Sequence, residues 1–172
     1  MAEIDPALKT PTDLNRNDLR SVADALNGAL ADAYAIYLKT KNFHWHVSGP
    51  HFRDYHLMLD EQAAQILAVT DDIAERVRKT GGTTLRSIGD IARRQTITDN
   101  DRAFVPPGDM LTELRQDNLT LVERFREARE AAEAAKDTAT SSLADEWIDQ
   151  AEERAWFLFE AGRGVSGLQA GV

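Results

Sequence analysis

All four histidines of the chain fall within a stretch of thirteen residues, and acidic side chains follow them at helical spacing. The histidines are His44, His46, His51 and His56. Imidazole binds metal ions through its ring nitrogens, and helices seldom gather so many histidines without such a reason. Metal binding is therefore the first chemistry that the sequence indicates.

Two pairs of possible ligands repeat a four-residue spacing in what we expect to be the second long helix. His56 and Asp60 form the first pair, and Asp71 and Glu75 form the second. Side chains four residues apart lie about one turn apart on one helix face, so each pair can serve one ion. His44 precedes the turn that His56 follows, which brings both to a similar height in an antiparallel hairpin. Alone, each pair is more typical of a solvated surface, so the metal interpretation depends on their combination.

The spacing between the two pairs predicts a site that one chain cannot close. Asp60 and Asp71 are eleven residues apart, which is about 16 Å along a helix, whereas metal–ligand bonds are about 2 Å. Two copies that meet antiparallel about a two-fold axis would place His44, His56 and Asp60 of one chain opposite Asp71 and Glu75 of the other. The chain also has no Glu-x-x-His motif of the kind that builds a di-iron site within one bundle.

Four long helices are expected to position these residues. We place them at about 17–47, at 51–80, from about 109 to an interruption at 137–142, and from there to about 162. The short break before the second helix requires an antiparallel pair. The segment 81–107, with a short helical candidate at 85–94, is long enough to return along a bundle of about 45 Å. The sequence therefore predicts an all-α, ferritin-like four-helix bundle with one long crossover carrying a short extra helix.

Composition fits a single globular domain. The chain has 172 residues, a formal net charge of −9 and no cysteine, which excludes disulfides and cysteine-ligated metal sites. We expect one domain over 1–172, with an N-terminal tail at 1–16 and a flexible C-terminal tail at 163–172. No apolar run approaches the roughly 18 residues that span a bilayer, and no secretory signal pattern is present. A cytoplasmic location without membrane contact is therefore expected.

Four segments resemble the ferroxidase signature of Dps proteins, the DNA-binding proteins from starved cells. They are Lys-Asn-Phe-His-Trp-His at 41–46, Gly-Pro-His-Phe at 49–52, the run 56–61, and Asp-Asp-Ile-Ala-Glu-Arg at 71–76. The similarity extends over nearly the whole chain, from about 19 to 161. Because the motif is long and its spacings are fixed, the resemblance is specific.

The resemblance implies a dodecameric cage that oxidises Fe(II) at sites between subunits, preferentially with hydrogen peroxide, and stores a ferric mineral inside. The family's ligand positions fall, without departure, on His44, His56, Asp60, Asp71 and Glu75. Trp45 matches a family tryptophan thought to intercept oxidising equivalents. His46 and His51 lie outside the ligand positions, and we expect them to be supporting, interface or surface residues.

The sequence departs from the family name in its charge. Many relatives bind DNA through a lysine-rich tail, whereas residues 1–18 here carry two cationic side chains against four anionic ones. Twelve copies at −9 each would carry −108, which repels a polyanion. We therefore predict weak or absent DNA binding at physiological salt.

Two other functions use the same features. One is a nucleoid-associated DNA-binding protein whose metal site is incidental, and the other is a structural bundle with zinc at its dimer interface, because these ligands also accept zinc. A cluster formed by Asp145, Glu146 and Asp149 also has two interpretations. It could stabilise the N-terminus of the last helix, or it could line a pore for iron at a three-fold axis.

Overall fold

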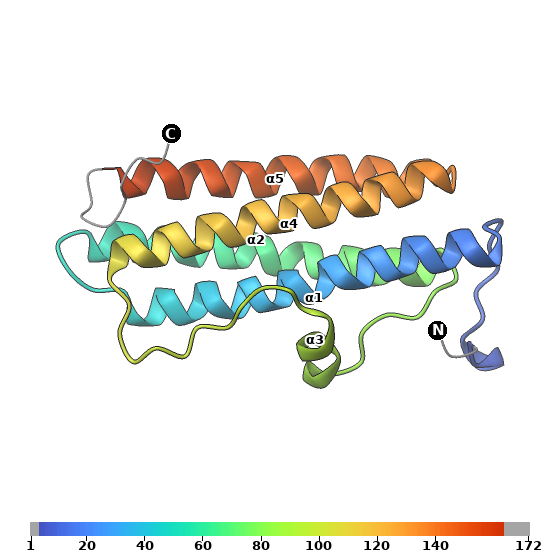
Figure 1. Ribbon diagram of the computed structural model, residues 1–172, viewed down its shortest axis with the longest axis horizontal. Coiled ribbons are helices and arrows are strands. Elements are labelled where there is room, and N and C mark those ends of the chain that lie inside the picture. The colour runs from blue at the N-terminus through green and yellow to red at the C-terminus, as the bar shows by residue number, and fades with distance from the viewer. Residues whose placement is uncertain (1–3, 164–172) are drawn as a thin grey trace.

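The structure is a computed structural model that describes residues 4–163, and all of its regular elements over that range are helices. They are the 3-10 helix η1 (Pro6–Leu8) and the α-helices α1 (Arg16–His46), α2 (Phe52–Lys79), α3 (Ile88–Arg94), α4 (Pro107–Ala134) and α5 (Thr138–Gly162). The predicted four-helix bundle is confirmed, and the short extra helix α3 lies in the crossover between α2 and α4 (Figure 1). Within 4–163, no helix has the length and apolar character that crossing a membrane requires.

The long helices form two antiparallel hairpins. α1 packs against α2, α4 packs against α5, and α1 and α4 join the two hairpins. The crossover runs back along the bundle and carries α3 against α1, so that α4 begins near the end of α1 (Figure 1). Apolar residues of the predicted stripes fill the space between the helices. Each long helix contributes buried apolar side chains, for example Leu26 of α1, Ile66 of α2, Leu121 of α4 and Trp147 of α5.

A buried carboxylate fixes the crossover to the bundle. Asp32 of α1 is fully buried and accepts hydrogen bonds from the hydroxyl of Thr96, at 2.8 Å, and the backbone N–H of Ile97, at 3.2 Å. The Nε of Arg124 on α4 lies 3.2 Å from the same carboxylate. A buried charge is tolerated when it is paired and hydrogen-bonded, so Asp32 joins α1, the crossover and α4 at one point.

Two helix ends share one backbone motif but differ in the residue that adopts a left-handed conformation. After α2 this residue is Gly81, with φ of 98°, and the next N–H donates to the carbonyl of Val77 at 2.9 Å. After α4 it is Lys136, with φ of 59°, and the next N–H donates to the carbonyl of Ala132 at 2.8 Å. Both ends are Schellman motifs, which favour glycine at the left-handed position.

We expect substitutions at these two positions to change stability in opposite directions. In Gly81→Ala, the new Cβ would lie 3.1 Å from Cγ2 of Thr12 and 3.2 Å from Cδ1 of Leu19, in a strained backbone conformation. The expected loss is about 1–3 kcal/mol. Lys136→Gly removes the strain of a left-handed lysine and should gain about 0.5–1 kcal/mol. Urea unfolding measures both, and a gain in Gly81→Ala would contradict the assignment.

The start of α5 differs from the sequence prediction. The expected interruption at 137–142 is wrong in extent, because α5 begins at Thr138. The buried carboxylate of Asp137 accepts the N–H of Thr140 at 3.2 Å and therefore caps the helix. This cap and the left-handed Lys136 start the helix within a Thr- and Ser-rich run of low helix propensity. α4 also begins slightly early, at Pro107 rather than near 109, since proline fits a first turn.

Residues 4–15, the described part of the expected tail at 1–16 before α1, contact the end of α2. The guanidinium of Arg78 donates to the carbonyl of Leu8 at 2.6 Å and to the hydroxyl of Thr10 at 3.3 Å. The N-terminal segment therefore covers the helix end that Gly81 closes. Apart from Arg163, the predicted C-terminal tail at 163–172 lies outside the described residues.

Candidate metal centre

His44, in the last turn of α1, faces His56, in the first turns of α2. The Nδ1 of each ring lies close to the backbone carbonyl oxygen of the other residue, at 2.8 Å from His44 and 2.9 Å from His56. The rings are stacked, with centroids 3.8 Å apart. Because a carbonyl oxygen can only accept, each Nδ1 donates, and each Nε2 keeps a free lone pair in the neutral ring. The short α1–α2 turn therefore fixes the orientation of two imidazoles, each with an Nε2 atom that could bind a metal ion.

Asp60 lies one helical turn after His56 and approaches the same pair of rings. Its Oδ1 is 3.9 Å from the Nε2 of His44 and 2.7 Å from the Nζ of Lys41. The hydrogen bond from the Lys41 ammonium, together with its charge, lowers the pKa of Asp60 below its usual value. The carboxyl group is 57% exposed and is ionised at neutral pH, which is the form that binds a cation.

The second pair of predicted ligands lies further along α2. Asp71 and Glu75 are both exposed, and the carboxylate of Glu75 lies 2.8 Å from the Nζ of Lys79, one turn later. The Lys79 hydrogen bond lowers the pKa of Glu75. This carboxylate is therefore also ionised at neutral pH and accessible to a cation from outside the chain.

In one chain, the five predicted ligands form two separate halves. We call His44, His56 and Asp60 the histidine half, and Asp71 and Glu75 the acidic half. Within residues 4–163, no three or more His, Asp or Glu side chains approach closely enough to hold an ion. Each half has accessible ligands and lacks the remainder of a coordination shell. Completion of the site by a second chain stays a prediction.

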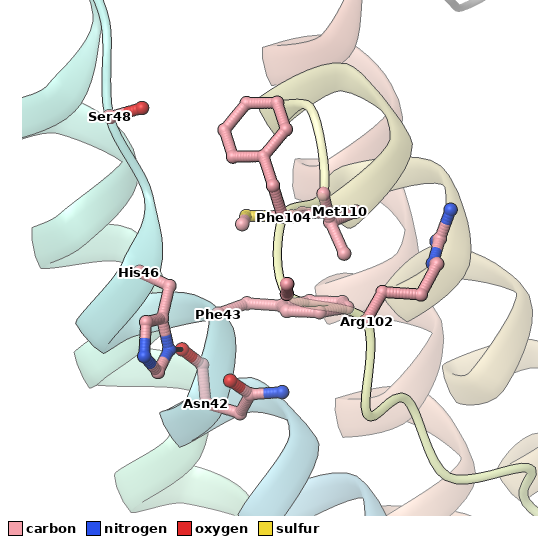
Figure 2. Close-up of a pocket in the computed structure, with 9 residues that line it drawn as sticks. Asn42, Phe43, His46, Ser48, Arg102, Phe104 and Met110 are labelled. Atoms are coloured by element: carbon pink, nitrogen blue, oxygen red, sulfur yellow. Dashed lines mark hydrogen bonds between the residues drawn. The ribbon is translucent and has the colours of Figure 1, made fainter.

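The other two histidines have different surroundings. The Nδ1 of His46 donates to the carbonyl of Asn42 at 2.8 Å, and Figure 2 shows both residues beside a cavity of about 360 Å³ between α1 and the crossover. His51 precedes α2 and is exposed, with its ring centroid 5.6 Å from that of Tyr55. These contacts are those of surface and packing residues.

Trp45 is next to His44, the first predicted ligand, and is 59% exposed. In a single chain it is therefore not a core packing residue. The Nζ of Lys41 lies 5.9 Å from the centroid of its ring, within the range of a cation–π interaction. A redox role for Trp45 stays a prediction.

The acidic cluster on α5 does not act on the helix N-terminus. Because α5 begins at Thr138, Asp145 lies about two turns into the helix, and the helix dipole acts on charges mainly within the first turn. That interpretation of the cluster is therefore wrong. Asp145 forms an ion pair with Arg129 of α4, while Glu146 and Asp149 are exposed. A pore at a three-fold axis stays a prediction.

Sequence reasoning missed the two lysines that pair with the carboxylates. Lys79 follows Glu75 by four residues, a spacing at which opposite charges on a helix interact. Lys41 precedes His44 by three residues, on the same helix face, and could therefore have been placed at the height of Asp60. The ammonium groups of both lysines lie beside carboxylates that a metal ion would bind.

The chain matches known proteins over most of its length. The family model described as "Ferritin-like domain" matches residues 23–161. "DNA protection during starvation protein 1" of Deinococcus radiodurans is 30% identical over 145 residues, covering 84% of this chain and 70% of that protein. "DNA protection during starvation protein" of Halobacterium salinarum is 35% identical over 135 residues, covering 77% and 72%.

Solved structures agree with the sequence matches. Dps from Thermosynechococcus elongatus superposes with a TM-score of 0.83 at 27% identity, covering 88% of this chain and 96% of that one. The archaeal Dps homologue from Halobacterium salinarum superposes with a TM-score of 0.84 at 26% identity, covering 98% and 97%. Taken with the ferritin-like match and the bundle with its long crossover, these similarities show that the chain belongs to the Dps family of ferritin-like proteins.

Proposed function

We propose that the chain is a ferroxidase and iron store, which oxidises Fe(II) with hydrogen peroxide at sites shared by two chains. Membership of the Dps family supports iron storage and protection of DNA as the broad function. Two Fe(II) ions supply the two electrons that reduce one peroxide molecule to water, and the Fe(III) formed is retained as a mineral. Both reactants that would otherwise generate damaging radicals are consumed.

The histidine half carries this proposal. Two imidazole rings keep their Nε2 lone pairs free, because both Nδ1 atoms donate to backbone carbonyls. Asp60 adds an ionised oxygen beside them. Imidazole and carboxylate together bind Fe(II) at neutral pH, and the anionic oxygens of Asp60, Asp71 and Glu75 favour Fe(III), which promotes oxidation.

Exposed apolar side chains support contact of the α1–α2 hairpin with a second chain. Leu38, Trp45 and Phe52 are 60%, 59% and 45% exposed, and all three lie on α1 or at the start of α2. Leu38 and Trp45 line the same groove beside α1, and neighbouring exposed apolar groups mark interaction surfaces. An antiparallel pairing of two hairpins would cover them and bring each histidine half to an acidic half. We further propose that such dimers assemble into a dodecameric cage in the cytoplasm.

In this proposal, DNA is protected by removal of iron and peroxide. The formal charge of −9 per chain opposes attachment to a polyanion. Zinc remains the main competitor for the same ligands, since imidazole and carboxylate suit both metals. Oxidation of iron distinguishes a ferroxidase from a structural zinc site or a DNA-binding protein.

Asp60→Ala and Glu75→Ala are each expected to lower the rate of Fe(II) oxidation by peroxide at least about 100-fold, because each removes a ligand from every shared site. Asp72→Ala is the matched control, since Asp72 is an exposed carboxylate of α2 outside the five ligand positions, and it should keep the wild-type rate. Stopped-flow absorbance with peroxide and with oxygen measures the rates. Wild-type rates in the two ligand variants would refute the site.

A further inference from the structure

Lys41 occupies a position that an incoming metal ion would need. Its side chain is only 18% exposed, and its Nζ lies 2.7 Å from Oδ1 of Asp60. The same oxygen lies 3.9 Å from the Nε2 of His44, which is free to bind metal. The ammonium group therefore contacts the carboxylate oxygen that faces the histidine rings.

An ammonium ion and a divalent cation cannot share this oxygen at low cost. A metal–oxygen bond is about 2 Å long, which would place a divalent ion within a few ångströms of the Lys41 ammonium. The two cations would repel each other at this distance, and the low exposure of the Lys41 side chain limits how far solvent screens that repulsion. Metal binding through Oδ1 of Asp60, the oxygen that lies near His44, therefore requires the ammonium to move.

The ring of Trp45 offers the displaced ammonium a second position. The Nζ of Lys41 already lies 5.9 Å from the ring centroid of Trp45, at the outer limit of a cation–π contact. Trp45 lies four residues after Lys41 on α1, so a rotation of the lysine side chain alone can bring its Nζ closer to the ring.

We propose that Lys41 is a resident counter-ion of the histidine half, which an incoming divalent cation displaces from Asp60 onto the ring of Trp45. This inference rests on the proposed function and concerns how binding of metal to the shared site is regulated. Without metal, the ammonium neutralises Asp60 and permits the acidic residues of two chains to approach. With metal, its displacement lowers the net affinity and so favours release of the oxidised ion.

The acidic half provides an internal comparison. Glu75 pairs with Lys79 at 2.8 Å, but the Lys79 side chain is 60% exposed and the pair is an ordinary surface pair of residues four apart. Exposed ion pairs of this kind contribute little, because solvent screens them and the lysine is free to move away. Lys79 should therefore oppose metal binding much less than Lys41 does.

Calorimetric titration with Zn²⁺, which is not oxidised, tests the proposal without using catalytic activity. Lys41→Met is expected to bind Zn²⁺ about tenfold more tightly than wild type, because it removes the cation and keeps the length of the side chain. Lys41→Arg, which keeps the cation, should bind no more tightly than wild type. Lys79→Met should change the affinity less than about threefold.

Tryptophan fluorescence follows the displaced ammonium directly. Zn²⁺ should change the emission of Trp45 in wild type, and the change should be absent in Lys41→Met. Subtraction of the Trp45→Phe signal removes the emission of the other two tryptophans. Circular dichroism confirms that each variant remains helical.

The outcomes separate the two claims. If wild type binds no Zn²⁺, or if Asp60→Ala binds Zn²⁺ as tightly as wild type, the shared metal site itself is refuted. If Zn²⁺ binds through Asp60 with equal affinity in wild type and Lys41→Met, the site stands and the counter-ion role of Lys41 is refuted. A tenfold gain without any change in Trp45 emission would refute the transfer to the indole ring.

Discussion

Co-assembly of Asp60→Ala chains with Glu75→Ala chains is expected to restore about a quarter of the wild-type ferroxidase rate, although each variant alone is inactive. A shared site takes Asp60 from one chain and Glu75 from another. In a random mixture of equal amounts, about one site in four combines an intact histidine half with an intact acidic half. Stopped-flow oxidation of Fe(II) on co-expressed, differently tagged chains measures the restored rate.

A mixture of wild type with the double variant Asp60→Ala, Glu75→Ala is the matched control. If sites are shared, this mixture also keeps about a quarter of its sites, because both halves must come from wild-type chains. If sites lie within single chains, the control keeps about half of its activity and the mixture of single variants keeps none. The two mixtures together therefore decide where the site is, independently of how fast it works.

The rate of iron oxidation should also depend on assembly of the chains into dimers. A variant that cannot dimerise should lose iron oxidation with all five ligands present, since each half alone lacks ligands. Leu38→Glu places a charge on an exposed apolar position of α1 and leaves the histidine and acidic halves unchanged. Analytical ultracentrifugation would show whether it remains monomeric, and a fully active monomer would contradict sharing.

The sequence predicted the hairpin geometry of the site because this geometry depends on backbone spacing alone. Because the turn between α1 and α2 is short, the two helices must be antiparallel, which places His44 and His56 at a similar height. Their rings are stacked in the structure. The eleven-residue spacing of Asp60 and Asp71 on an unbroken helix likewise required two separate halves. Helical periodicity is regular, so the positions of the helices and the height of each residue along the bundle can be predicted from it.

Features that depend on rotamers and local capping could not be predicted in the same way. The reciprocal bonds between each Nδ1 and the opposite carbonyl require knowledge of how two specific turns meet. The early start of α5 depends on the carboxylate of Asp137 and on a lysine in a left-handed conformation. Neither has a composition signal, because Thr- and Ser-rich runs are more often loops.

A buried ion pair between α1 and α4 leads to the second large expected effect. The Nζ of Lys39 lies 2.7 Å from Asp117 and 3.1 Å from Glu113, and the Lys39 side chain is only 5% exposed. Glu113 also accepts hydrogen bonds from Asn100 and Arg102 of the crossover. Lys39 therefore holds together two long helices and the segment that joins the hairpins.

Lys39→Met is expected to destabilise the fold by about 3–5 kcal/mol, because it leaves the carboxylate of Asp117 buried without its cation. Adding Asp117→Leu should recover most of this loss, since an apolar pair of similar volume replaces a buried ion pair with little net change. Urea unfolding of wild type, the single variant and the double variant measures the difference. Equal stability of the two variants would contradict an uncompensated charge as the cause.

The pH dependence of Lys39→Met provides a further check on the same pair. Burial raises the pKa of Asp117 above its usual value even beside Lys39, and removal of the lysine should raise this pKa further. A carboxyl group whose pKa is higher in the folded than in the unfolded state binds more protons when folded, so stability falls as pH rises. Lys39→Met should therefore regain part of its lost stability as pH falls through the raised pKa of Asp117, whereas the double variant, which lacks the carboxyl group, should not share this gain. A parallel gain in both variants would assign the effect to other groups and not to Asp117.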